Sequence, residues 1–220
     1  MLLEKEREAV VEYGKKLISR GLVTGTGGNI SLANESGELV AISPSGVGYF
    51  ETRPEDVVVV KLDESVVDGH LRPSSEIHFH LALYRQRPDI RAVVHTHSIY
   101  ATTIACLEED LPAVHYLIAQ AGETVRCAPF ATPGSHELAA YICETIGLDN
   151  AVLMANHGLI AVGPTLPAAF GAAEKVEYVA RLYYQARCIG EPVILGTAQM
   201  DAVKQHAQGY GQQAKLQDEI

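Results

Sequence analysis

The chain has 220 residues, of which 47% are hydrophobic, and a formal net charge of −10. This length suits one sizeable domain with a buried core, and the acidic balance argues against a nucleic-acid-binding surface.

No targeting or membrane segment is expected. The N-terminus is charged from residue 4, unlike a signal peptide, and no stretch approaches about 18 consecutive apolar residues. The cysteines are widely spaced without a C-x-x-C pair, which predicts buried free thiols in a reducing compartment; they are Cys106, Cys127, Cys143 and Cys188. We therefore expect a cytoplasmic protein.

The first half of the chain predicts one helix, three strands and a second helix. Apolar residues at helical spacing indicate a helix over residues 3–20 that ends at Gly21. Strands are expected in "NISL", after a glycine-rich turn, in "ELVAIS" and in "DVVVVKL", and "DESVVDGHLRPSS" reads as a loop. Ser74 or Ser75 can cap a helix that starts near Glu76 and ends at Pro88.

The second half predicts a strand in "IRAVVHTHS", a helix in "IYATTIACLEE" and a helix over 134–147 capped near Ser135. A strand, a turn and a strand follow in "NAVLMANHGLIAVG", and the longest helical pattern covers 166–189. Several strands are only a turn apart, so we expect a mixed or antiparallel sheet with helices on its faces. Residues 206–220 are polar and predict a mobile tail after a single domain, 1–205.

Two histidines one residue apart, His95 and His97, follow the apolar run of "AVVHTHS". On a strand, such residues face the same way about 6.6 Å apart, so both can bind one ion, and zinc favours imidazole nitrogen. Two ordinary polar residues at a strand end are the alternative. His78 and His80 have the same spacing on a predicted helix, where they point about 200° apart and are not expected to share an ion. Glu76 and His80 share a helix face.

His157 lies in a tight turn between two apolar runs, where Gly158 permits an unusual backbone angle. A lone histidine in a turn is more often an ordinary surface residue. With His95 and His97, however, it completes a set of three imidazoles, which leaves a fourth metal position to a carboxylate, water or substrate.

Three segments offer small hydroxyl residues and free backbone N–H groups: "TGTGGN", "SPSG" (43–46) and "PSSE" (73–76). The first has no lysine and is not a nucleotide P-loop, and alone it is more often only a turn. The third is also a predicted helix N-terminus, which suits a phosphate. Together the three could hold a phosphomonoester without basic side chains.

The ordered motifs resemble those of the class II aldolase and adducin family, and most closely its fuculose-phosphate aldolases. They are "GTGGNIS", "SPSG", "RPSSE", "VVHTHS", "LPAVHYLIAQAG", "RCAPFAT" and "NHGLIA", and the resemblance runs from about residue 5 to 210. It implies a three-layer α/β/α fold, a homotetramer with sites at subunit interfaces, and one zinc ion, or another divalent metal, per subunit.

The resemblance also implies roles for single residues. The metal would be bound by Glu76, His95, His97 and His157, and Glu76 would then move aside to act as general base. The substrate phosphate would be held by Gly28, Asn29, Ser45, Gly46, Ser74 and Ser75. Tyr116 would reach an adjacent subunit's site and protonate the aldehyde oxygen, and Tyr210 matches a catalytic tyrosine on the C-terminal tail.

The implied reaction cleaves L-fuculose 1-phosphate, or a related deoxy-ketose 1-phosphate, to dihydroxyacetone phosphate and a short aldehyde such as L-lactaldehyde. The metal would polarise the carbonyl, and no lysine lies in the site motifs to form a Schiff base. Pro133 and His78 depart from the compared pattern, which has an aromatic residue and an arginine there. The first departure bears on the identity of the aldehyde, and 5-deoxyribulose, methylthioribulose and rhamnulose 1-phosphates remain alternative substrates.

Three other functions share the motifs in part. A pentulose-phosphate 4-epimerase would carry Asp in place of Glu76, and a methylthioribulose-phosphate dehydratase would not match "HYLIAQAG". An adducin-like module would bind partners without catalysis and need not keep three histidines together with Glu76. The sequence therefore favours the aldolase.

Overall fold

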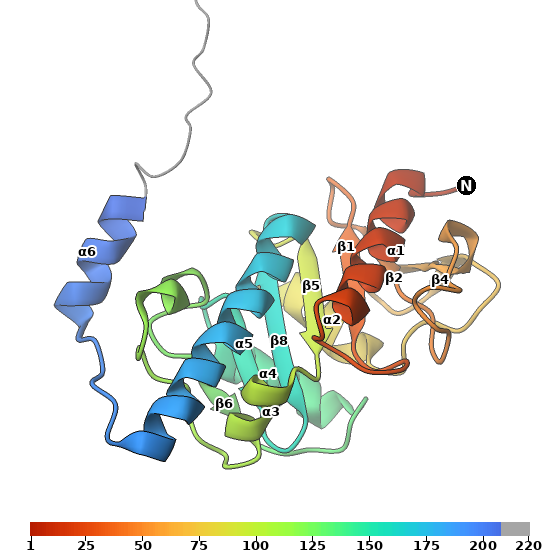
Figure 1. Ribbon diagram of the computed structural model, residues 1–220. Coiled ribbons are helices and arrows are strands. Elements are labelled where there is room, and N and C mark those ends of the chain that lie inside the picture. The colour runs from red at the N-terminus through yellow and green to blue at the C-terminus, as the bar shows by residue number, and fades with distance from the viewer. Residues whose placement is uncertain (208–220) are drawn as a thin grey trace, which may run out of the picture.

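The computed structural model describes residues 1–207. The helices are α1 (Glu4–Ser19), α2 (Ile77–Gln86), α3 (Ile99–Ala105), α4 (His136–Ile146), α5 (Leu166–Ile189) and α6 (Thr197–Ala207), with short 3-10 helices η1 (Pro54–Asp56) and η2 (Tyr116–Gln120). The strands are β1 (Asn29–Ala33), β2 (Leu39–Ile42), β3 (Val58–Lys61), β4 (Val66–Asp68), β5 (Ala92–Thr96), β6 (Cys127–Ala128), β7 (Ala151–Met154) and β8 (Gly158–Gly163). Figure 1 shows their arrangement.

All strands form one sheet in the order β4-β3-β2-β1-β5-β8-β7-β6. Neighbouring strands are antiparallel except β6 and β7, which are parallel, so the predicted mixed sheet is confirmed. Helices α1, α3 and α5 pack on one face, where α5 crosses β5 and β8 (Figure 1), and α2 and α4 pack on the other. The three-layer α/β/α fold is therefore also confirmed.

The central strands are buried on both faces. In β5, Ala92 and Val94 belong to the core under α1, α3 and α5, whereas Val93 belongs to the core under α2 and α4. Both sides of β5 thus exclude water, which explains why its sequence is a continuous apolar run rather than an alternating one. The polar residues of β5, His95 and Thr96, therefore stand at its C-terminal end.

The structure differs from the sequence predictions at short elements. Strand β4 lies inside the segment predicted as a loop, and β6 and α6 were not predicted. Helix α3 ends at Ala105, whereas the predicted helix continued through "CLEE". Helix α2 begins at Ile77 with Glu76 itself as the N-cap residue. The division into 1–205 and a tail stays a prediction, because α6 already includes residues 206 and 207 and the remainder lies outside the described residues.

All four cysteines are free, as predicted, but the expectation that they are buried is wrong. Cys106 and Cys188 are exposed, and Cys127 and Cys143 are half-buried. Within residues 1–207, no helix combines the length and apolar character that crossing a membrane requires.

Candidate metal centre

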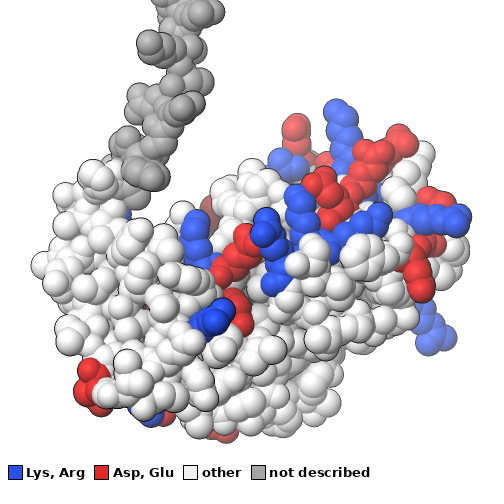
Figure 2. All heavy atoms as spheres, in the orientation of Figure 1, with Lys and Arg blue, Asp and Glu red and all other residues white. Residues whose placement is uncertain are grey.

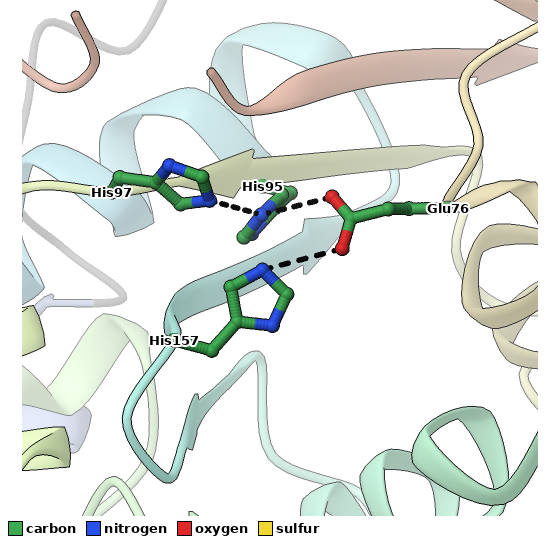
Figure 3. Close-up of side chains that lie close together, drawn as sticks. All are labelled: Glu76, His95, His97 and His157. Carbon is green, nitrogen blue, oxygen red and sulfur yellow. Dashed lines mark hydrogen bonds and ion pairs between the residues drawn. The ribbon is translucent and has the colours of Figure 1, made fainter. Parts of the chain in front are cut away.

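The four predicted metal ligands come together at the C-terminal end of β5 (Figure 3). His95 is the fourth residue of that strand, and His97 follows its end. Glu76 stands at the N-terminus of α2, and His157 lies in the turn between β7 and β8. Since β5 pairs with β8, the sheet itself places this turn beside the strand end.

The ligand atoms converge on one point. His95 Nε2 lies 2.9 Å from His97 Nε2 and 3.2 Å from Glu76 Oε2, and Glu76 Oε1 lies 3.2 Å from His157 Nε2. One ligand atom from each residue lies within 4.8 Å of all the others. Three imidazole nitrogens and one carboxylate form a donor set typical of a zinc site with an exchangeable position.

A backbone contact orients the ring of His95 toward the other candidate ligands. Its Nδ1 lies 3.0 Å from the carbonyl oxygen of Leu159, which only accepts, so Nδ1 carries the hydrogen and Nε2 faces the other ligands. Burial, together with the charges of His95 and His157, lowers the pKa of His97 to about 4. His97 therefore stays neutral near pH 7, with a lone pair available for a metal.

A cation would neutralise a negative charge that the protein buries. Glu76 Oε1 is buried and faces the ring nitrogen Nε2 of His157 at 3.2 Å. Burial raises the pKa of the Glu76 carboxyl, but hydrogen bonds and charges from His157 and His95 outweigh burial and hold that pKa well below its usual range. The resulting buried carboxylate, surrounded by imidazoles, fits a divalent metal.

Two glycines permit the close packing around these ligands. A Cβ at Gly158 would collide with the carbonyl oxygen of Thr96. Gly28 has a φ of +69°, and a Cβ there would lie 2.6 Å from the carbonyl oxygen of His95. The predicted unusual backbone angle at Gly158 is wrong, because Asn156 takes the positive φ in this turn, at 53°. Gly158 is required for close approach instead.

The three segments predicted to hold a phosphate lie side by side. Pro44 and Pro73 form an isolated antiparallel bridge, and the N–H of Ser74 donates to the carbonyl oxygen of Ser43 at 3.0 Å. The hydroxyl of Ser43 accepts from the N–H of Ile30 at 3.2 Å, which joins the second segment to β1. The loops thus meet, whereas their binding of a phosphate stays a prediction.

The candidate phosphate ligands differ in their exposure to solvent and in the hydrogen bonds that they already make. Ser45, Gly46 and Ser75 are exposed. Ser74 is buried, and its hydroxyl accepts from the N–H of Glu76 at 3.3 Å. Ser74 therefore also fixes the start of α2.

Several neighbours of the site were not anticipated from the sequence. Asn29 Nδ2 donates to Glu76 Oε2 at 2.8 Å, so this side chain supports the candidate base in addition to any contact with a phosphate. The hydroxyl of Tyr49 donates to the carbonyl oxygens of Gly27 and Gly28, at 3.1 and 2.8 Å. These contacts join residues that are 21 or more positions apart in the sequence, so no local sequence pattern predicts them.

Of the two tyrosines predicted to be catalytic, only Tyr116 lies within the described residues. Tyr116 is 52% exposed at the start of η2, which packs mainly against α5 and α6. Tyr210 lies outside the described residues. Pro133 is exposed beside Gly134, where a Cβ would lie 2.7 Å from the carbonyl oxygen of Ser75, so its loop borders the site.

A second group of potential ligands, Glu64, His78 and His136, lies between α2 and α4. The ring centroids of His78 and His136 are 4.0 Å apart with an interplanar angle of 40°, against centroid separations of 4.7, 4.9 and 5.3 Å in the first cluster. The group is a tilted imidazole pair with a hydrogen bond between His78 Nδ1 and Glu64 Oε1, at 3.0 Å.

Comparisons with known proteins agree with this arrangement. The family model described as the Class II Aldolase and Adducin N-terminal domain matches residues 8–184. The 5-deoxy-D-ribulose 1-phosphate aldolase of Bacillus thuringiensis serovar kurstaki is 55% identical, over 97% of this chain and 100% of the relative. A 5-methylthioribulose-1-phosphate/5-deoxyribulose-1-phosphate aldolase of Rhodospirillum rubrum is 37% identical, over 96% of this chain and 94% of the relative. A solved L-fuculose 1-phosphate aldolase is 43% identical with a TM-score of 0.90, covering 93% of this chain and 96% of its own.

Proposed function

Because the chain belongs to the class II aldolase and adducin family, as an aldolase of the fuculose-phosphate and deoxyribulose-phosphate type, we propose that it cleaves a 5-deoxypentulose 1-phosphate. The sequence favoured L-fuculose 1-phosphate and kept 5-deoxyribulose 1-phosphate as an alternative. Because the relative of 55% identity is a 5-deoxy-D-ribulose 1-phosphate aldolase, 5-deoxyribulose 1-phosphate becomes the preferred candidate substrate. The products would be dihydroxyacetone phosphate and acetaldehyde.

The convergence of Glu76, His95, His97 and His157 carries the proposal. These residues would hold Zn²⁺ or another divalent ion, one per subunit, which supplies Lewis-acid polarisation of the ketose carbonyl. A buried carboxylate lies beside the imidazoles, so the same cluster offers a proton acceptor next to the polarised carbon. Cleavage of a bond beside a carbonyl with transfer of a proton needs both the polarising metal and the proton acceptor.

Glu76 would move the proton at C3. In the direction of synthesis, its carboxylate takes a proton from C3 of dihydroxyacetone phosphate, and C3 then forms a bond to the aldehyde carbon. Tyr116 of a neighbouring subunit would donate a proton to the aldehyde oxygen. In cleavage the same steps run backwards: the C3–C4 bond breaks, and Glu76 returns the proton to C3.

Backbone N–H groups and hydroxyls would hold the phosphate at the start of β1 and α2. Gly28, Asn29, Ser45, Gly46, Ser74 and Ser75 are the candidates. Ser45→Ala is the cleanest test, because its side chain is exposed whereas Asn29 also supports Glu76. We expect Ser45→Ala to reduce the preference for dihydroxyacetone phosphate over dihydroxyacetone, by roughly 1.5–3 kcal/mol for one lost bond to a charged oxygen. An unchanged preference would remove Ser45 from the phosphate site.

A homotetramer with sites at subunit interfaces belongs to the same proposal. Tyr116 is exposed on η2, whose main contacts are with α5 and α6, which supports a role for this side chain in the site of a neighbouring subunit. Beside it runs a groove of about 760 Å³ whose lining includes Leu117, Ala202 and Val203. Figure 2 shows charged side chains gathered over α1, with few over η2 and α6.

Light scattering after size-exclusion chromatography tests this assembly. We expect four chains per particle, and a smaller particle for Val203→Glu, which places a charge in the groove. A monomer of the unmodified chain with full activity would contradict the role of Tyr116.

An assay of dihydroxyacetone phosphate release tests the activity. The panel is 5-deoxyribulose, 5-methylthioribulose, L-fuculose and rhamnulose 1-phosphates, with Glu76→Gln as the inactive control. We expect 5-deoxyribulose 1-phosphate to give the highest kcat/KM. Epimerised or dehydrated products without dihydroxyacetone phosphate would contradict the aldolase activity. A higher kcat/KM for L-fuculose 1-phosphate would instead contradict the proposed substrate and favour the one that the sequence predicted.

A further inference from the structure

A continuous line of buried side chains runs from the core of the protein to Glu76. The hydroxyls of Tyr84 and Ser31 are 2.8 Å apart, and Ser31 Oγ lies 2.7 Å from His80 Nδ1. His80 Nε2 lies 2.5 Å from Asn29 Oδ1, and Asn29 Nδ2 lies 2.8 Å from Glu76 Oε2. Glu76 and His80 are four positions apart and share a face of α2, so the same helix positions both residues that Asn29 contacts.

The acceptor-only carboxylate fixes the direction of every hydrogen bond in this line. Because Glu76 Oε2 cannot donate, the Asn29 amide must present Nδ2 to it and Oδ1 to His80. His80 Nε2 must therefore carry the ring hydrogen, and Nδ1 must accept from Ser31. Ser31 then accepts from Tyr84, although a backbone carbonyl oxygen 3.3 Å away also lies near that hydroxyl.

His80 is suited to a single protonation state. It is fully buried, and burial together with the charge of His95 lowers its pKa to about 3. A neutral ring with one N–H and one lone pair matches one donor on Ser31 and one acceptor on Asn29. The Asn29 amide is therefore held at both ends, by the Glu76 carboxylate at Nδ2 and by the N–H of His80 at Oδ1.

We propose that His80 is a positioning residue, which through Asn29 holds the Glu76 carboxylate in place by its Oε2 atom. This inference rests on the proposed function in one respect: it assumes that Glu76 moves the C3 proton. If His80 loses its N–H, Asn29 Oδ1 loses its donor, and the amide is no longer fixed in the position from which Nδ2 binds the carboxylate. Asn29 thus holds Oε2 from the side of the core, whereas Oε1 faces His157 Nε2 at 3.2 Å, on the side of the metal-site histidines.

Nuclear magnetic resonance tests the hydrogen-bond direction without any assay of activity. Long-range proton–nitrogen spectra of the full chain, labelled with ¹⁵N-histidine and free of metal, distinguish the two neutral forms of each ring. We expect His80, identified by the loss of its signals in His80→Gln, to be neutral at pH 7 with the hydrogen on Nε2. A hydrogen on Nδ1, or a charged ring at pH 7, would overturn the proposal even if the chain proves not to be an aldolase.

Two substitutions at His80 test the consequence for turnover. His80→Leu fills the space but donates nothing, and we expect kcat to fall by about 10- to 100-fold, as for other residues that orient a metal-site ligand. His80→Gln places an amide N–H near the position of Nε2 and should restore most of the loss. Equal losses in both variants would overturn the proposal, because packing and not the donated hydrogen would then matter. His78→Leu, on the opposite side of α2, is the matched control and should keep normal turnover.

Discussion

Glu76, His78 and His80 lie close together at the start of α2, yet their side chains enter different surroundings. Glu76 reaches the metal-site histidines, His80 lies behind it in the core, and His78 lies against the tilted ring of His136 of α4. Residues two positions apart on a helix point about 200° apart, so the spacing H-x-H has a different meaning here than at the end of β5. Single substitutions on the two segments can therefore separate metal binding from helix packing.

Replacement of His95 should empty the metal centre. His95 Nε2 lies closest to the other ligand atoms and is oriented by its backbone contact, so its loss removes one ligand and the organisation of the others. After dialysis against Zn²⁺, His95→Ala should bind well below one equivalent per chain, measured by plasma mass spectrometry. His78→Ala is the control and should match the unmodified chain. A full equivalent in His95→Ala would refute the centre as described.

Glu76→Gln separates the base from the ligand. The amide keeps the shape of the side chain but accepts a proton poorly, so turnover should fall by about 10²–10⁴, the usual contribution of a positioned base. Three imidazoles remain, and bound metal should be largely kept. Exchange of the C3 proton of dihydroxyacetone phosphate in D₂O isolates this step. Near-native exchange in the variant would assign the base to another group.

At the scale of elements, the β7–β8 turn must approach the end of β5 closely. A methyl group at Gly158 would collide with the Thr96 carbonyl oxygen and lie 3.2 Å from His97 Cδ2. We expect Gly158→Ala to lower the free energy of unfolding by about 1–3 kcal/mol, measured in urea, and to weaken metal binding. Gly171→Ala is the control, because Gly171 lies inside α5 and a Cβ there would have nothing within 4 Å, and it should gain about 0.5–1 kcal/mol. Equal effects of both substitutions would contradict the packing argument.

Long periodic elements and polar residues at strand ends were accessible from the sequence, whereas short elements were not. α5 is found over 166–189 as predicted, because its apolar pattern continues for many turns. β6 has only two residues and β4 three, too few for an alternating pattern to show. The cluster of His95, His97 and His157 could be predicted because imidazoles at a strand end and in an adjoining turn have a recognisable chemistry, and the resemblance added Glu76. The support of Glu76 by Asn29 was not, since it depends on a pairing across 47 positions.

For the whole molecule, the buried histidine predicts instability in acid when no metal is bound. The pKa of His80, about 3 in the fold, is lower than its ordinary value of 6.5. The unfolded chain therefore binds more protons between these values, and stability falls as the pH drops below about 6.5. The slope for one such group is up to about 1.4 kcal/mol per pH unit. Partly exposed His97, with its pKa lowered to about 4, contributes in the same direction but less.

Urea unfolding of the metal-free protein at pH values from 7 to 4.5 measures this slope. His80→Gln removes the titrating ring and should flatten the curve in that window. An unchanged curve would mean that His80 does not keep its low pKa in the fold.

The distance of the metal ligands along the chain has a consequence for the stability of the whole fold. Residues 76, 95, 97 and 157 belong to segments that only the folded state brings together, so a bound ion acts as a reversible cross-link between them. Binding to the native state alone adds about 2.7 kcal/mol to the free energy of unfolding at a metal concentration of 100 Kd. Tm should therefore rise with metal concentration in the unmodified chain and stay flat in His95→Ala. The same melting curves would rank Zn²⁺ against Co²⁺ and Mn²⁺ without any substrate, so the preferred metal can be identified before the sugar is.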